Sequence, residues 1–128
     1  MTLPIVWQRL VSGGETCPRC GSTQAAVERA VATLTEVLRP LNIEPTLETI
    51  GLDQDTFDQA PTESNRIWIA GRPLEEWVGA QVSGSQCCSV CGDNSCRTLR
   101  IDGTTYEGVP ESLIVKAGLA AASTLVTA

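Results

Sequence analysis

The stretch SGGETCPRC, residues 12–20, decides the fold, because it joins a strand pattern to a helix pattern. On its N-terminal side, Leu3 to Val11 has apolar ends and contains Ile5 and Trp7, which suit a half-buried strand. On its C-terminal side, from about Ser22 to Leu38, apolar residues recur at helical spacing and form one stripe. The sequence therefore predicts a Cys-x-x-Cys pair at the opening of an amphipathic helix that follows a strand.

A helix start changes the chemistry of a cysteine that lies there. The first amide groups of a helix are unpaired donors, and the helix dipole adds partial positive charge at the same end, so a thiolate is stabilised. We expect Cys17 to be the nucleophile and Cys20, one turn deeper, to resolve a mixed disulfide. Pro18 pre-sets the first helical turn. Arg19 adds positive charge that favours the thiolate, whereas the negative charge of Glu15 disfavours it. A structural zinc half-site and an inert pair stay open as alternatives.

The rest of the chain completes one predicted α/β domain over residues 1–128, with no internal repeat or linker. Its elements follow from apolar spacing and turn residues, in this order: strand Glu44 to Leu52, acidic turn Asp53 to Pro61 with room for one short helix, strand Arg66 to Ala70, short helix Pro73 to Val78, loop Ser83 to Ser95, hairpin strands Arg97 to Asp102 and Thr104 to Glu107, and helix Glu111 to Leu125. We expect the three tryptophans to line the core or a groove wall.

Composition excludes several partners. Nine basic and fifteen acidic residues give a net charge of −6. A nucleic acid or an anionic membrane needs a cationic face, so we expect neither as a partner. The chain has no histidine, which removes the commonest general base and the commonest nitrogen ligand. A metal site would have to be built from thiolates, with carboxylates as the other strong ligands.

The ends of the chain predict a cytoplasmic protein. Met1 to Val6 has neither a basic region nor an apolar run of signal-peptide length. The uncharged stretch from Ala117 to Ala128 is too short to cross a bilayer. In the cytoplasm, paired cysteines are more often catalytic or metal-binding than structural.

A second group of thiols follows later in the chain, at Cys87, Cys88, Cys91 and Cys96. These four could bind a soft metal such as zinc, cuprous copper, mercuric ion or trivalent arsenic. They could also form disulfides that exchange with the first pair, or ligate an iron–sulfur cluster, although the spacing matches neither common ferredoxin pattern. A loop stapled only for rigidity is the structural alternative. Whether the two cysteine groups lie together in space stays open.

The chain resembles a family of small bacterial and archaeal proteins of the thioredoxin-like superfamily, a domain of unknown function with a CPxC motif and a C-terminal Cys-rich loop. The resemblance lies in Cys17 to Gly21, Glu63 to Glu76, the Cys-rich loop and Tyr106 to Ile114. It implies an α/β, thioredoxin-like fold with a central mixed sheet of about four strands, flanked by helices, and a Cys-rich loop insertion.

Two positions depart from the thioredoxin pattern. Asn65 stands where these proteins usually place a cis-proline, and a cis bond without proline costs about 2.5–4 kcal/mol, so we expect a trans peptide there. Thr16 replaces the tryptophan that commonly precedes the cysteine pair. Both departures weaken the case for a general disulfide reductase, and the first could let a metal approach both sulfurs.

These observations predict a thiol–disulfide oxidoreductase that uses Cys17 and Cys20, with the later cysteines as a second redox or metal-thiolate group. Its partners would be protein or small-molecule thiols and disulfides. The alternative is a carrier or detoxification accessory protein that binds a soft metal or metalloid through thiolates, with zinc as one candidate ion.

Overall fold

The computed structural model describes residues 1–11, 18–60, 63–86, 95–106 and 108–127. Within these ranges the chain forms the following elements in order: β1 Thr2–Leu10, α1 Pro18–Leu38, η1 Arg39–Leu41, β2 Glu44–Leu52, α2 Gln54–Gln59, β3 Arg66–Ile69, β4 Arg72–Pro73, α3 Leu74–Val78, β5 Gln81–Gln86, β6 Ser95–Ile101, β7 Thr104–Tyr106 and α4 Glu111–Thr127. None of these helices is both long and apolar enough to cross a membrane.

A mixed sheet of four strands forms the centre, in the order β2-β1-β3-β4. β1 and β2 are parallel over their full length, from Thr2 opposite Glu44 to Leu10 opposite Leu52. Parallel neighbours need a crossover connection, which α1 supplies. β3 is antiparallel to β1, and β4 is antiparallel to β3. The predicted α/β class and the mixed sheet of about four strands are confirmed.

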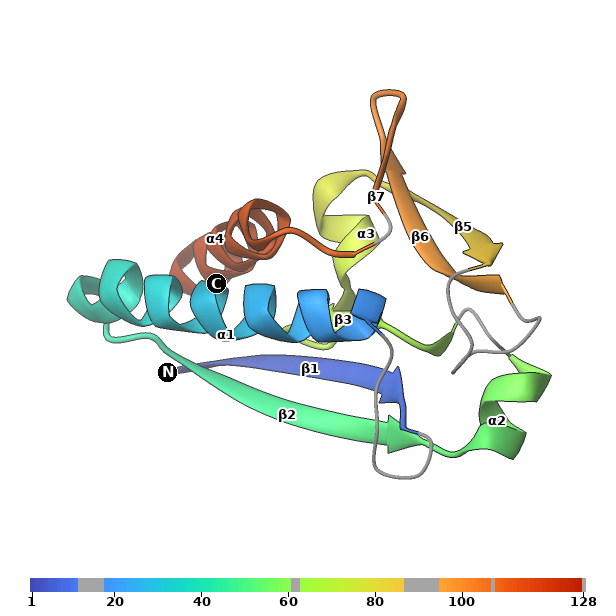
Figure 1. Cartoon of the computed structure of the whole chain (residues 1–128). Helices are drawn as coiled ribbons and strands as arrows, with labels where there is room; N and C mark the ends of the chain where they lie inside the picture. The colour runs from blue at the N-terminus through green and yellow to red at the C-terminus, as the bar shows by residue number, and fades with distance from the viewer. Residues whose placement is uncertain (12–17, 61–62, 87–94, 107, 128) are drawn as a thin grey trace.

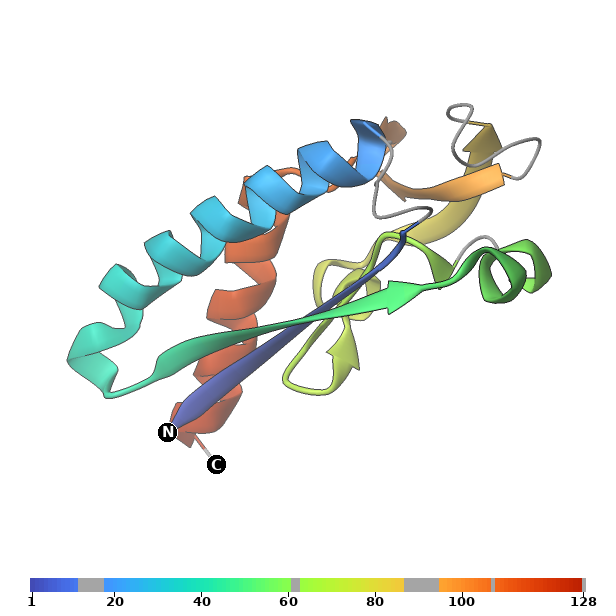
Figure 2. The ribbon, with the colours of Figure 1, turned by 60° about the horizontal axis from the view of Figure 1, so that its bottom comes forward.

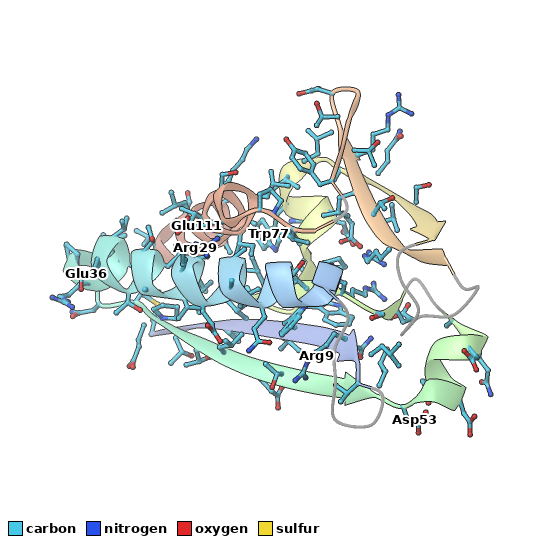
Figure 3. All side chains as sticks on the ribbon, viewed as in Figure 1. Arg9, Arg29, Glu36, Asp53, Trp77 and Glu111 are labelled. Atoms are coloured by element: carbon cyan, nitrogen blue, oxygen red, sulfur yellow. The ribbon has the colours of Figure 1, made fainter. Side chains whose placement is uncertain are left out.

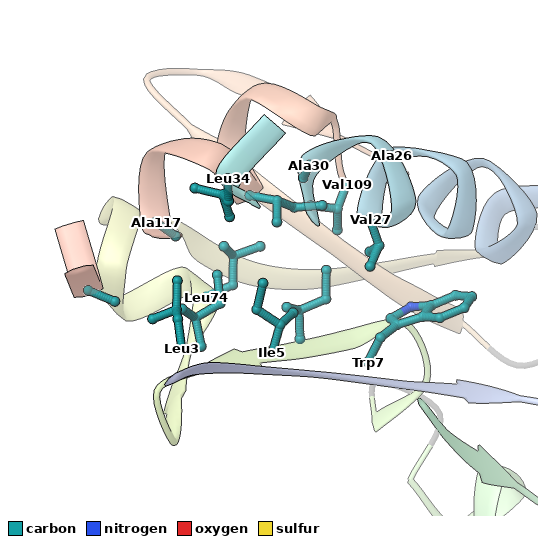
Figure 4. Close-up of a cluster of buried hydrophobic side chains, with 14 of the residues drawn as sticks. Leu3, Ile5, Trp7, Ala26, Val27, Ala30, Leu34, Leu74, Val109 and Ala117 are labelled. Carbon is teal, nitrogen blue, oxygen red and sulfur yellow. The ribbon is translucent and has the colours of Figure 1, made fainter. Parts of the chain in front are cut away.

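Helices α1 and α4 pack together over one face of this sheet (Figures 1 and 2). The core lies between these layers, and Figure 4 shows Trp7 beneath the first half of α1, on the side of Ala26 and Val27. Its largest fully buried side chains come from the strands and the helices alike: Leu3, Ile5, Trp7, Leu10, Val27, Leu34, Leu38, Ile67, Ile69, Leu74 and Ile114. α2 lies beyond the end of β2 instead of over the strands, and Ile50 on the opposite sheet face is 39% exposed.

A second, three-stranded antiparallel sheet is inserted between α3 and α4, in the order β5-β6-β7. The β6–β7 hairpin turns at Asp102 and Gly103, whose φ angles are +49° and +83°. Positive φ at both central residues fits the right-handed twist of the strands, so the predicted hairpin is confirmed. Leu99 of β6 is buried and joins the main core, which attaches the insertion to the rest of the fold.

Several predicted boundaries differ from the structure, and three of the differences are informative. α1 begins at Pro18 and not near Ser22, because proline is well suited to the first helical position. The short helix begins at Leu74, since Pro73 has an extended backbone and pairs in β4. The predicted loop from Ser83 to Ser95 is strand at both ends, because β5 runs to Gln86 and β6 starts at Ser95. β5 carries one large apolar side chain, the exposed Val82, so no alternation in its sequence reveals it.

Candidate functional site

The predicted site residues fall partly outside the described part of the chain. Cys17, Cys87, Cys88 and Cys91 lie outside the described residues. The backbone of Cys20 lies in the first turn of α1. The backbone of Cys96 lies in β6, where Ser85 of β5 is its partner. The structure therefore describes the elements that carry or border the two cysteine groups.

The start of α1 carries the partial positive charge of a helix N-terminus. α1 begins at Pro18, the residue after Cys17 in sequence, and continues for 21 residues. Its first turn contains no acidic residue, so no carboxylate there compensates the partial positive charge of the helix end. Thr23, fully buried one turn further along, accepts a hydrogen bond from the Val109 amide at 3.0 Å. This bond fixes the start of α1 against the segment that leads into α4.

The turn that leads into β3 is tied to the end of β1 by two buried side chains. The Ser64 hydroxyl accepts a hydrogen bond from the Leu10 amide at 2.8 Å. The Asn65 side-chain oxygen accepts a hydrogen bond from the Trp7 indole at 3.0 Å. Asn65 has a φ of +62°, a left-handed conformation that asparagine tolerates better than most residues. Within the described ranges every peptide bond is trans, which confirms the expectation at Asn65.

Two ion pairs lie close enough to influence each other. Both carboxylate oxygens of Glu63 lie 2.9 Å from Arg66, and Gln8 donates to the same carboxylate at 3.3 Å. Arg97, next to Cys96 in sequence, donates to Glu75 of α3 at 2.5 Å, with side-chain exposures of 6% and 13%. Burial lowers the pKa of Arg97, the Glu75 carboxylate opposes this shift, and Arg66 adds to it through like-charge repulsion. The buried pair fixes the inserted sheet to α3.

Each tryptophan carries an arginine over its ring. The guanidinium carbons of Arg9 and Arg66 lie 4.9 and 4.6 Å from the ring centroids of Trp7 and Trp68. Arg72 lies over Trp77 at 4.6 Å. Cation–π contact of this kind contributes about 0.5–1 kcal/mol at exposed sites. Trp7 lies in the core, as predicted, and the other two tryptophans are half-buried.

The second cysteine group falls between and at the start of two paired strands, β5 and β6, whose facing ends are described. Gln86 pairs with Ser95 at the end of the β5–β6 ladder, and paired strand residues have Cα atoms about 5 Å apart. Gln86 and Ser95, the described residues that flank residues 87–94 in sequence, are therefore held side by side. In both views, these ends of β5 and β6 lie at the same end of the molecule as the start of α1 (Figures 1 and 2). The described flanks of the two cysteine groups share one end of the fold.

The predicted metal ligands stay a prediction. Among the residues that the structure describes, no three acidic or cysteine side chains lie close enough together to hold a metal ion. Asp53, Asp55 and Asp58 are exposed, and Asp53 instead caps α2 by accepting a hydrogen bond from the Thr56 amide at 2.8 Å. This bond lowers the pKa of Asp53.

Sequence reasoning missed the contacts that hold this end of the molecule together. Trp7 and Asn65 are far apart in the chain, as are Glu75 and Arg97, and no periodicity links such pairs. One local signal was available: an arginine two positions from a tryptophan on a strand lies on the same sheet face. That spacing occurs at Trp7 and Arg9.

Comparison with known proteins gives a family but no activity. Residues 3–118 match a family described as "Domain of unknown function (DUF2703)". An uncharacterized protein of Archaeoglobus fulgidus is 45% identical over 114 residues, which cover 89% of this chain and 83% of that protein. No solved structure matches the chain, so the thioredoxin-like placement stays a prediction. The match across nearly the whole described fold shows that the chain belongs to the DUF2703 family.

Proposed function

We propose that the chain is a thiol–disulfide oxidoreductase in which Cys17 is the nucleophile and Cys20 the resolving thiol. The observation that carries the proposal is the position of the α1 start at Pro18, directly after Cys17 in sequence. A thiol at such a position has a lowered pKa, and the thiolate is the reactive form. We place the reaction in the cytoplasm, where paired thiols are kept reduced.

The arrangement of the main sheet supports a thioredoxin-like fold for this chemistry. In the strand order β2-β1-β3-β4, α1 connects the parallel pair β1 and β2. β3 is antiparallel to β1, and β4 is antiparallel to β3. α1 and α4 cover the same sheet face. In such an arrangement the strand β1 delivers the chain to the helix start that bears the first cysteine pair. The turn at Ser64 and Asn65 borders the same end of β1.

The proposed reaction exchanges one disulfide for another. The Cys17 thiolate attacks one sulfur of a disulfide in a protein or small-molecule partner, forms a mixed disulfide and releases the partner's other sulfur as a thiolate. The Cys20 thiol then loses its proton, attacks Cys17 and displaces the second partner thiolate. The partner gains two electrons and two protons and becomes a dithiol, while Cys17 and Cys20 become a disulfide. A dithiol of another protein would reduce the Cys17–Cys20 disulfide by the same two exchanges in reverse, becoming a disulfide itself and restoring both thiols.

The later cysteines would serve as a second redox or metal-thiolate group. Cys87, Cys88, Cys91 and Cys96 lie in or beside a segment whose ends are paired in the β5–β6 ladder. Those ends lie at the same end of the fold as the start of α1, which supports exchange between the two groups.

Trapping experiments test the assignment of the first pair. Cys20→Ser should accumulate a mixed disulfide with a model disulfide such as oxidised glutathione or dithionitrobenzoate, because the attack by Cys17 is intact and the resolving step is lost. Cys17→Ser should accumulate none at this pair. The two variants are compared by intact mass and by peptide mapping, so that adducts on later cysteines are counted separately. Equal trapping at both positions would contradict the assignment.

The second candidate is a thiolate carrier for a soft metal or metalloid. The absence of histidine, the six cysteines and the pairing of Gln86 with Ser95 favour it. The trans peptide at Asn65, where thioredoxin-like proteins usually have a cis-proline, also favours it. Native mass spectrometry of protein purified without chelator distinguishes the two. Stoichiometric metal on reduced thiols supports the carrier, whereas metal-free protein that is lighter by two or four hydrogens supports the oxidoreductase.

A further inference from the structure

Half of the large apolar side chains that are exposed in the described part of the chain lie along the contact between α1 and α4. Eight such side chains are exposed, and four of them line the outer seam between α1 and α4. These four are Val37 at 50% exposure, Leu41 at 47%, Leu119 at 41% and Val126 at 50%. The seam faces away from the sheet, so no described element covers it (Figures 1 and 2). A contiguous apolar patch on a small domain marks an interaction surface.

The seam has both a projection and hollows that could receive it. Towards the C-terminal ends of the two helices lies a groove of about 300 Å³, with buried Leu38 and Ala122 among its lining residues. Towards the start of α4 lies a second hollow of about 580 Å³, lined by residues that include Thr33 and Val115. Leu119 borders both, so this exposed side chain stands between two depressions.

The charges along the seam do not follow the net charge of −6 that the whole chain carries. Arg29 and Glu111 face each other across the two helices with 3.7 Å between Nε and Oε2 (Figure 3), and Glu36 pairs with Arg39 at 2.9 Å. Two of the three described cations near the apolar patch are paired with a carboxylate, and Lys116 beside Leu119 adds one further positive charge. The face therefore does not share the negative charge of the whole chain, which would repel a second copy.

We propose that a second copy of this chain docks on this seam, so that α1 and α4 of the two copies form a four-helix interface about a two-fold axis. An interface of this symmetry must be complementary to itself. Leu119 and the hollows beside it place a projecting side chain and the depressions that could receive it on one surface. The largely paired charges of this face avoid the repulsion that two acidic chains would otherwise meet. This inference does not depend on the proposed redox function.

The dimensions of the seam are sufficient for a specific dimer. A helix the length of α4 extends about 25 Å, and two adjacent helices are about 20 Å wide. The seam therefore presents about 500 Å² per copy, or about 1,000 Å² in total, which is the size at which specific interfaces begin. Val37 near the end of α1 and Leu41 in η1 lie at the opposite end of α1 from Pro18, so the dimer would leave the proposed cysteine site open.

Sedimentation equilibrium of the full chain under reducing conditions tests the proposal. The wild-type chain should be a dimer at roughly 100 µM, and Leu119→Lys should raise the dimer dissociation constant by at least about tenfold, equivalent to about 1.4 kcal/mol. Leu47→Lys is the matched control, because Leu47 has a similar exposure of 37% but lies in β2. Circular dichroism verifies that both variants fold, and Val37→Lys replaces Leu119→Lys if the latter does not.

The outcomes separate the alternatives. Loss of the dimer in Leu119→Lys and its retention in Leu47→Lys would support the seam. A wild-type monomer at this concentration would overturn a second copy as the occupant and leave the seam to a different protein. A dimer that survives Leu119→Lys, or one that Leu47→Lys disrupts equally, would overturn the seam as the interface.

Discussion

The ion pair between Glu75 and Arg97 offers the sharpest test of how the inserted sheet is held. Replacing Glu75 with glutamine keeps the shape and one hydrogen-bond acceptor but removes the charge opposite a guanidinium that is only 6% exposed. Burial already lowers the pKa of Arg97, and the Glu75 carboxylate is what opposes this shift. The variant therefore leaves a buried positive charge without its nearest compensating carboxylate.

The expected loss follows from the geometry of the pair. At about 3 Å and an effective dielectric constant of about 20, two unit charges attract each other by about 5 kcal/mol, and desolvation offsets part of this. Removing one partner of a buried pair costs about 3–5 kcal/mol. Because Glu75 is 13% exposed and glutamine retains an acceptor, we expect a loss near the lower limit, about 3 kcal/mol.

Urea unfolding at neutral pH, under reducing conditions and followed by tryptophan fluorescence, measures this loss. Glu76→Gln is the matched control, since Glu76 is 56% exposed, lies 3.5 Å from Arg72 and should contribute less than about 1 kcal/mol. The double variant Glu75→Met, Arg97→Met should lose less than Glu75→Gln alone, because both buried charges are removed. If Glu75→Gln costs no more than Glu76→Gln, the pair does not anchor the insertion and the reasoning is wrong.

Two further predictions concern α4 and α2. Gly118→Ala should lower the free energy of unfolding, measured in urea, by about 1 kcal/mol. The new Cβ would lie 2.6 Å from a methyl carbon of the fully buried Leu34, and this overpacking outweighs the better helix propensity of alanine. An increase in stability would instead show that α1 and α4 can move apart at no cost. Asp53→Asn should be less stable than the wild type at any pH above the ordinary carboxyl pKa, because a carboxyl with a lowered pKa stabilises the fold only while it is ionised. The difference in stability should shrink as the pH falls through the lowered pKa of Asp53 in the folded state. A difference in thermal unfolding between the two proteins that does not change with pH would contradict this.

Sequence patterns predict the main sheet well because its strands are apolar and bounded by turn residues. β2 has the predicted bounds, Glu44–Leu52, and β1 differs by one residue at each end. The central strands alternate between a buried and an exposed face, which is the signal that such reasoning detects. β4 consists only of Arg72 and Pro73, too short to carry any pattern, and β5 exists because β6 pairs with it.

The candidate site divides in the same way. The cysteines are local features that the sequence shows directly, and the Cys-x-x-Cys motif indicates that a helix opens there. The apolar stripe alone, which begins near Ser22, places the start of α1 too late. The bonds from Trp7 to Asn65 and from Arg97 to Glu75 depend on tertiary contacts between distant segments. A single sequence holds no local signal for either bond, although each positions an element that borders a cysteine group.

The central position of β1 determines when this domain can fold. β1 leaves the ribosome before both of its neighbours in the sheet, β2 and β3. β3 can pair with β1 only after the chain has been synthesised as far as Ile69, and contacts between such distant segments form slowly. Until then the sheet on either side of β1 is incomplete. Nascent or truncated chains that stop before β3 therefore expose Leu3, Ile5 and Trp7, and they would be natural clients of holding chaperones.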